Sequence, residues 1–192
     1  MKSEHANLQH RPFLIPIWLT AIAAIGAAAI FAFGVFCFWV WFTANTTTVV
    51  VIRHAEKEPG SAVDPALSAA GEARAALLAH MFGDVKGAGR LDAIYTSAAL
   101  RNRLTAAPLA GRLGILPIVA PSDDPRGLAH RVLRENSGRR AMIIGHVNTV
   151  PEIVAALSGR SDIPSIDEKE YGVMYIVTVP RIGHANLLRL NY

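Results

Sequence analysis

Two hydrophobic patterns divide the chain. Residues 13–42 are almost entirely apolar, and no Asp, Glu, Lys, Arg or His occurs from Pro12 to Ile52. A helix needs about 20 apolar residues to cross the roughly 30 Å hydrocarbon core of a bilayer, so this run predicts one transmembrane helix. From residue 46 onward, short runs rich in β-branched residues alternate with segments of helical periodicity, which predicts strands alternating with helices.

The segment after the apolar run predicts six strands and four helices. Strands that alternate with helices indicate right-handed crossovers and a mostly parallel sheet, and the last two strands predict an antiparallel hairpin at its edge. The expected fold is therefore an α/β, three-layer αβα sandwich preceded by one transmembrane helix. The predicted strands are Thr46–Ile52, Leu91–Thr96, Ile115–Ala120, Ala141–Gly145, Val173–Val179 and Ala185–Leu190; the predicted helices are Ser68–Phe82, Ala99–Leu113 with an interruption at Pro108, Pro125–Asn136 and Pro151–Leu157.

A cleaved signal peptide is the alternative interpretation of the apolar run. The apolar core of a signal peptide is normally about 7–15 residues, and a cut after Ala44 would place the bulky Phe42 three residues before the cleavage site. We therefore predict a retained signal anchor. Lys2 and Arg11 precede the run, whereas no basic residue follows it until Arg53. The positive-inside rule then puts the amino terminus in the cytoplasm and the remainder outside it.

These patterns predict a cytoplasmic tail over residues 1–12, a membrane anchor over 13–42 and one domain over 46–192. The single cysteine, Cys37, lies in the apolar run, so the domain has no cysteine for a disulfide, a zinc–thiolate site or a nucleophile. Fifteen arginines against four lysines, with a net charge of +4, favour phosphate groups or anionic lipid headgroups as partners. No basic run is dense enough to indicate nucleic-acid binding.

Polar side chains follow three of the predicted strands. Arg53 and His54 come directly after the first, Ser97 to Arg101 after the second, and His146 after the fourth. The Arg-His dipeptide alone is also compatible with a surface-loop histidine. However, the carboxyl ends of parallel strands meet at one edge of a sheet, where ligands bind. Two arginines and two histidines at that edge predict a cationic pocket for a phosphoryl group.

The residues at these strand ends match an ordered set of family motifs. The chain resembles the histidine phosphatase (phosphoglycerate mutase-like) superfamily over essentially Thr47 to Tyr192, and it is most similar to the small phosphohistidine phosphatase type. Arg53-His54-Ala55 corresponds to the motif Arg-His-Gly, Ser97 to Ala106 to the pattern Ser-Pro-Leu-x-Arg-x-x-x-Thr-Ala, Gly145-His146 to a Gly-His after a buried strand, and Leu67 to Gly71 to Leu-Thr-x-x-Gly.

The resemblance implies a metal-independent phosphatase without a cofactor. His54 would attack phosphorus as a neutral imidazole and form a phosphohistidine that water cleaves. Arg53, Arg101 and a protonated His146 would neutralise the phosphoryl oxygens. Ser97 and Asn148 are expected to bind the substrate, and a helix-capping role is equally compatible with Asn148. The expected substrate is a phosphomonoester or phosphoramidate on a small molecule, glycan, lipid headgroup or phosphoprotein.

The sequence departs from the family pattern in ways that leave alternatives open. Ala55 replaces a glycine, and Ala98-Ala99 replaces Pro-Leu. No glutamate follows the Arg101 motif where the mutase branch carries its general acid. Phosphoglycerate-mutase-like transfer and a catalytically silent phosphate-binding protein on the same fold are the alternative functions. The candidate acids are Asp123, Asp124, Glu56 and Glu152, each of which is also compatible with a surface or capping role.

Overall fold

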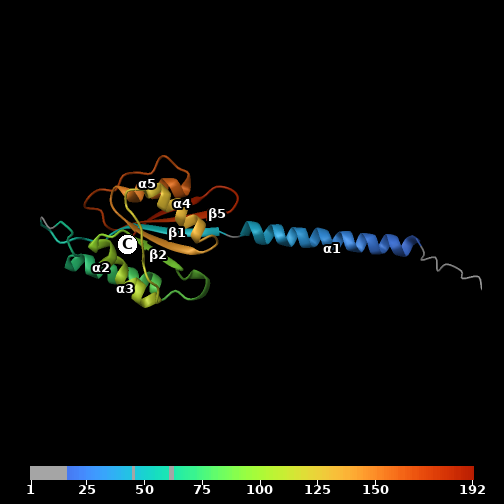
Figure 1. Cartoon of the computed structure of the whole chain (residues 1–192), viewed down its shortest axis with the longest axis horizontal. Coiled ribbons are helices and arrows are strands. Elements are labelled where there is room, and N and C mark those ends of the chain that lie inside the picture. Colours follow the sequence, from blue (N-terminus) through green and yellow to red (C-terminus); the bar gives the residue numbers. More distant parts are fainter. Residues whose placement is uncertain (1–16, 45, 61–62) are drawn as a thin grey trace, which may run out of the picture. The chain divides into compact units, whose positions relative to one another are not determined.

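The computed structural model describes residues 17–44, 46–60 and 63–192 (Figure 1). The chain divides into two compact units, Met1–Trp41 and Phe42–Tyr192. The first unit contains most of the long helix α1, and the second contains a six-stranded sheet covered by helices.

Helix α1 runs from Ile17 to Ala44 and carries no charged residue. Its segment Trp18–Val40 has 23 residues with a mean hydropathy of 2.4, and none of it is buried in the protein. The helix is therefore long and apolar enough to cross a membrane. Both a membrane anchor and a signal sequence have this composition near an amino terminus. Residues 13–16, and the Lys2 and Arg11 on which the predicted orientation depends, lie outside the described residues.

The sheet has the strand order β3-β2-β4-β1-β5-β6. Strands β3, β2, β4 and β1 are parallel, β5 is antiparallel to β1, and β6 is antiparallel to β5. The predicted α/β fold, with a mostly parallel sheet and an antiparallel edge hairpin, is confirmed. The strands are β1 Thr46–Arg53, β2 Ala93–Thr96, β3 Ile118–Val119, β4 Arg140–Gly145, β5 Val173–Pro180 and β6 Asn186–Asn191.

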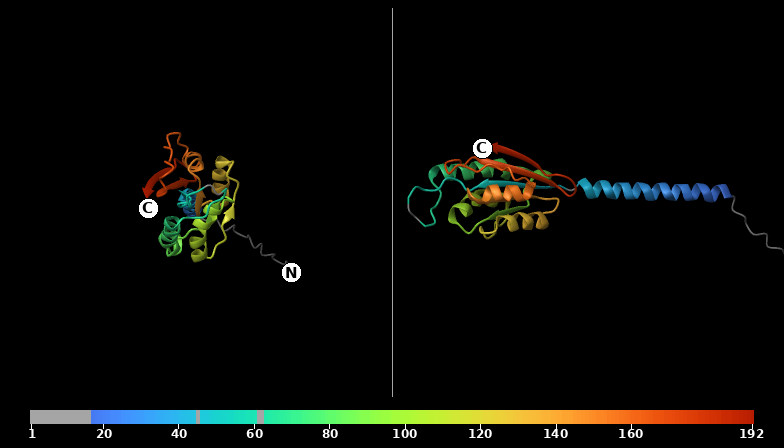
Figure 2. Two further views of the ribbon diagram at one scale, coloured as in Figure 1. Left: turned by 90° about the vertical axis from the view of Figure 1, so that its left-hand side faces the viewer. Right: turned by 90° about the horizontal axis from the view of Figure 1, so that it is seen from above.

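Helices cover both faces of the sheet, so that β1 is buried on each side (Figures 1 and 2). Val49 and Val51 pack with α4 and α5, whereas Val50 and Ile52 pack with α2 and α3. The sequence of a strand that is buried on both faces is a continuous apolar run, which is the pattern that predicted β1. The helices are α2 Ala69–Gly83, α3 Leu100–Leu113, α4 Pro125–Glu135 and α5 Thr149–Ser158, with a 3₁₀ turn at Gly87–Gly89.

Several predicted boundaries differ from the observed ones by one or more residues, and three differences from the prediction have a clear local cause. Strand β3 is shorter than predicted because Ile115 still donates its backbone N–H to the carbonyl of Ala110, at 3.1 Å, as part of the end of α3. Pro108 does not interrupt α3, which is continuous through it. Helix α5 begins at Thr149 rather than Pro151, because the N–H groups of Thr149 and Val150 bond to the preceding loop.

Candidate active site

Adjacent parallel strands bring the two predicted histidines together. Arg53 is in register with Gly145 across the β1–β4 pair, and the His54 backbone N–H donates to the Gly145 carbonyl at 3.0 Å. The ring centroids of His54 and His146 lie 5.5 Å apart. Strand β2 pairs with β4 on its other side, so Ser97 also reaches this edge. The topology therefore assembles the cluster that the strand-end residues predicted.

Helix α3 is attached to this edge by two buried polar side chains. Asn102 donates from Nδ2 to the carbonyl of Ile144, at 2.8 Å, just before His146. The Thr105 hydroxyl donates to the carbonyl of Arg101 at 2.7 Å and accepts from the backbone N–H of Ala55 at 3.0 Å. These bonds fix the distance between Arg101 and the loop that carries His54. Both residues belong to the second motif, but its pattern gave no reason to assign them this role.

His54 is buried, with 4% of its surface exposed. Its Nδ1 lies 2.8 Å from the carbonyl oxygen of Ala55. A carbonyl oxygen only accepts, so Nδ1 carries the proton and Nε2 keeps its lone pair. Burial is the largest of the effects that together lower the pKa of His54 to about 4; the hydrogen bond to the Ala55 carbonyl opposes it, and the charges of Arg101 and Arg53 act in the same direction as burial. The imidazole is therefore neutral at neutral pH.

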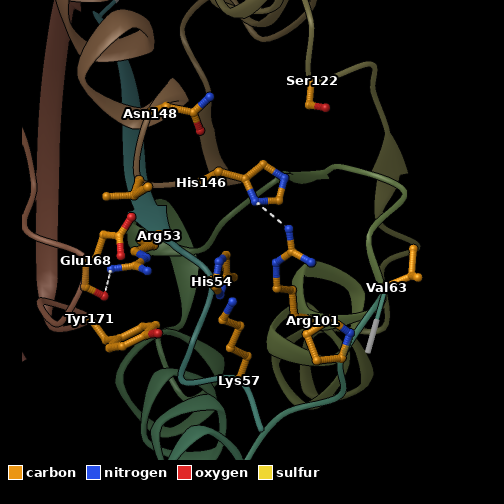
Figure 3. A pocket seen from close by; sticks show the side chains of 12 residues that line it. Arg53, His54, Lys57, Val63, Arg101, Ser122, His146, Asn148, Glu168 and Tyr171 are labelled. Carbon is orange, nitrogen blue, oxygen red and sulfur yellow. Dashed lines mark hydrogen bonds between the residues drawn. The ribbon is translucent and has the colours of Figure 1, made fainter. Parts of the chain in front are cut away.

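His146 is oriented by Ser97 and by Arg101, and Figure 3 shows the contact with Arg101. Arg101 donates from Nη2 to Nδ1 at 3.4 Å, so the proton of the neutral ring lies on Nε2, which is 3.1 Å from the Ser97 hydroxyl. Burial lowers the pKa of His146, and Arg101 and Arg53 add to the effect. The expected protonated His146 is thus disfavoured in the unliganded site, because two neighbouring guanidinium groups already repel a third charge.

Arg53 is almost fully buried beneath the pocket. Its Nη1 donates to the backbone carbonyls of Asp167, Glu168 and Glu170 at 3.1, 2.8 and 3.2 Å, and its guanidinium carbon lies 4.0 Å from the centroid of the Tyr171 ring. Its Nε is buried and has no hydrogen-bond partner among the described residues. The guanidinium is therefore fixed on one side by the protein and keeps donor capacity for an oxyanion.

A cavity of about 540 Å³ opens over these groups. His54, Arg53, Arg101, His146 and Asn148 line it, as predicted for residues of one site. Asn148 occupies the position before α5, but its side chain makes no capping hydrogen bond. Ser97 is not among the lining residues; its hydroxyl instead lies 3.1 Å from Nε2 of His146. The complete lining comprises Arg53, His54, Lys57, Val63, Pro65, Arg101, Ser122, His146, Val147, Asn148, Glu168 and Tyr171.

None of the four candidate general acids lines this cavity. Asp124 caps α4 by accepting from the Gly127 N–H at 2.8 Å, and Glu56 forms an ion pair with Arg74 at 2.6 Å. Asp123 and Glu152 are exposed elsewhere. Sequence reasoning missed the carboxylate that does line the cavity, Glu168, because it lies in an irregular loop without a recognisable motif. Among the residues that the structure describes, no group of three or more His, Cys, Asp or Glu side chains could hold a metal ion.

Comparison with known proteins identifies the fold. A family profile of the histidine phosphatase superfamily (branch 1) matches residues 49–123, which include the first two motifs. The solved protein histidine phosphatase SixA, in complex with tungstate, superposes with a TM-score of 0.62 at 18% identity, covering 75% of this chain and 96% of that chain. The domain has the histidine phosphatase fold. The resemblance drawn from the sequence motifs is confirmed.

Other solved phosphatase structures superpose on this chain with similar coverage. A mycobacterial glucosyl-3-phosphoglycerate phosphatase matches with a TM-score of 0.61 at 14% identity, covering 76% of this chain and 99% of that chain. A phosphoserine phosphatase from Entamoeba histolytica, in complex with phosphoserine, matches with a TM-score of 0.58 at 16% identity, covering 76% and 96%. No curated protein matches the chain. At these identities the structures establish the fold alone, and their substrates differ from one another.

Proposed function

We propose that this protein is a membrane-anchored, metal-independent phosphatase that hydrolyses a phosphomonoester or phosphoramidate through a covalent phosphohistidine on His54. The observation that carries the proposal is the state of His54 itself. Its ring is neutral, its Nδ1 proton is held by the Ala55 carbonyl, and two guanidinium groups line the same cavity.

The first step is attack of the His54 Nε2 lone pair on phosphorus. Arg53 and Arg101 stabilise the negative charge that spreads over the three non-bridging oxygens of a loose transition state. The incoming phosphoryl group also brings negative charge next to His146. That charge opposes the effect of the arginines on the His146 pKa and favours an imidazolium that donates to a phosphoryl oxygen. Ser97 then acts by orienting His146, and Asn148, which lines the same cavity, is proposed to contact the substrate.

In the second step, water attacks the phosphohistidine and releases inorganic phosphate. The neutral imidazole of His54 is a good nucleophile, and it leaves phosphorus again as a neutral imidazole, so one histidine serves both steps.

The chemistry of the site selects a phosphoryl group carried by a small molecule, a glycan, a lipid headgroup or a phosphoprotein. We keep hydrolysis rather than transfer to a second alcohol as the proposed reaction, since the family's mutase-branch glutamate is missing after the Arg101 motif.

Helix α1 is proposed to be a retained anchor. Its apolar stretch is longer than the core of a signal peptide, and the basic residues Lys2 and Arg11 before it favour a cytoplasmic amino terminus. The phosphatase domain then lies outside the cytoplasm and close to the bilayer, because β1 begins at Thr46, just two residues after α1 ends. A reporter fused to the carboxyl terminus tests this orientation. Reporter activity confined to the cytoplasm contradicts it.

The enzymatic proposal is tested with the full chain in detergent micelles. The assay follows hydrolysis of p-nitrophenyl phosphate in the presence of a metal chelator for the wild type, for His54→Ala and for the control His130→Ala, which changes an exposed histidine of α4. We expect wild-type and control activity to agree and His54→Ala to lose at least about 10³-fold in kcat. If the His54→Ala variant is as active as the wild type, the covalent mechanism is ruled out. Inactivity of the folded wild type rules out the enzyme.

A further inference from the structure

A tight turn between α5 and β5 forms one wall of the cavity. The Glu170 backbone N–H bonds to the Asp167 carbonyl at 3.0 Å and closes the turn. The Nη1 atom of Arg53 then donates to the carbonyls of Asp167, Glu168 and Glu170. Arg53 is almost fully buried and therefore holds this turn in a fixed position, although the two lie more than 100 residues apart in the sequence.

The turn carries three carboxylates, and two of them have local partners. Asp167 accepts from the Lys169 backbone N–H at 2.8 Å, and Glu170 forms an ion pair with Arg189 at 2.8 Å. The side chain of Glu168 lines the cavity with His54 and Arg101 (Figure 3). Within the described part of the chain, no hydrogen bond or ion pair involves its carboxylate, and it is the only carboxylate in the cavity lining.

A phosphomonoester with a poorly acidic alcohol needs a proton donor at the leaving oxygen, because the expelled alkoxide is otherwise too basic. Such a donor must reach the leaving oxygen, which lies in line with phosphorus and the attacking His54 nitrogen. The cavity lining offers no other carboxyl group for this purpose. Tyr171 also lines the cavity, but its ring is stacked on the Arg53 guanidinium.

We propose that Glu168 is the general acid of this phosphatase, and that Arg53 positions it by binding the backbone of its turn. The assignment rests on the proposed function. As the His54 Nε2–P bond forms, the P–O bond breaks and its electron pair goes to the leaving oxygen, which takes the proton of the Glu168 carboxyl group. The resulting carboxylate then accepts a proton from the water that attacks phosphorus and breaks the N–P bond. The products are the free alcohol and inorganic phosphate, and Glu168 is again protonated.

The role of Glu168 is tested by comparing leaving groups. The full chain is assayed in detergent micelles on p-nitrophenyl phosphate, whose phenol leaves without a proton, and on phenyl phosphate, whose phenol is far less acidic. The variants are Glu168→Gln and the matched control Glu170→Gln, which changes a carboxylate of the same turn that pairs with Arg189. We expect Glu168→Gln to lower kcat/KM on phenyl phosphate about 10²-fold and on p-nitrophenyl phosphate less than about 3-fold.

A rescue substitution supplies the second readout. Glu168→Asp keeps a carboxyl group at this position, and we expect it to recover part of the phenyl phosphate activity that Glu168→Gln loses. If Glu168→Gln loses activity equally on both substrates, its role is structural and the proposal is overturned. The proposal is also overturned if the Glu168→Gln variant keeps wild-type activity on both substrates. The same loss in Glu170→Gln overturns it too. A wild type that hydrolyses neither substrate contradicts the phosphatase function itself.

Discussion

Burial of a neutral His54 links the site to the pH dependence of folding. Its pKa is about 4 in the folded protein against 6.5 for the free side chain. Between these values the unfolded chain binds a proton that the folded protein does not, so the stability contributed by His54 is fully present above pH 6.5 and is lost as the pH falls toward 4. Since one pH unit corresponds to about 1.4 kcal/mol, the full loss is about 3 kcal/mol.

His54→Gln removes this titration and keeps a polar side chain of similar length. Urea unfolding of the full chain in detergent micelles is followed by circular dichroism at pH 7 and pH 4.5, with His130→Gln as the control histidine. The wild type and the control should lose about 2 kcal/mol more than His54→Gln over this interval, on top of the losses that all three share. Parallel losses in all three proteins refute the reasoning, because His54 then titrates near its ordinary value.

Three further substitutions test other parts of the account. Arg101→Ala should lower kcat by about 10²–10³-fold while leaving the fold intact, and an unchanged kcat contradicts a role for Arg101 in charge stabilisation. Gly71→Ala should destabilise the domain by about 1–3 kcal/mol in urea unfolding, since its Cβ would collide with the backbone carbonyl oxygen of Glu56, whereas the Cβ of the control Gly111→Ala meets nothing within 4 Å. Thr105→Val removes the hydroxyl that accepts from Ala55; we expect about 1–3 kcal/mol lower stability together with reduced kcat, and no change in either measurement contradicts that link.

The sequence was sufficient to predict the sheet and the strand-end cluster because both depend on strong, simple signals. The continuous run Val49–Ile52 is typical of a strand that is buried on two faces. Parallel topology then brings the carboxyl ends of β1 and β4 together without any knowledge of contacts, and this alone places His54 beside His146. Ordered motifs added Arg101 to the same edge. These features are local in sequence or follow from strand direction.

What the sequence could not indicate depends on contacts between distant segments. The turn that presents Glu168 has no periodicity and no motif, and it is held by a guanidinium 115 residues away. The neutral state of His146 follows from its burial beside two arginines, which no spacing rule reports. The resemblance implied that Ser97 binds substrate, and the structure shows its hydroxyl 3.1 Å from Nε2 of His146. In each case the deciding interaction is a tertiary one.

The covalent phosphohistidine is the central claim, and trapping it is the most direct test. The full-length protein is mixed with p-nitrophenyl phosphate, quenched in alkali on the millisecond timescale, and analysed by peptide mass spectrometry under conditions that preserve phosphoramidates. We predict a phosphoryl group on Nε2 of His54 that appears before the steady state and disappears as substrate is exhausted. A phosphoryl group on His146, or turnover without any phosphorylated peptide, contradicts the mechanism.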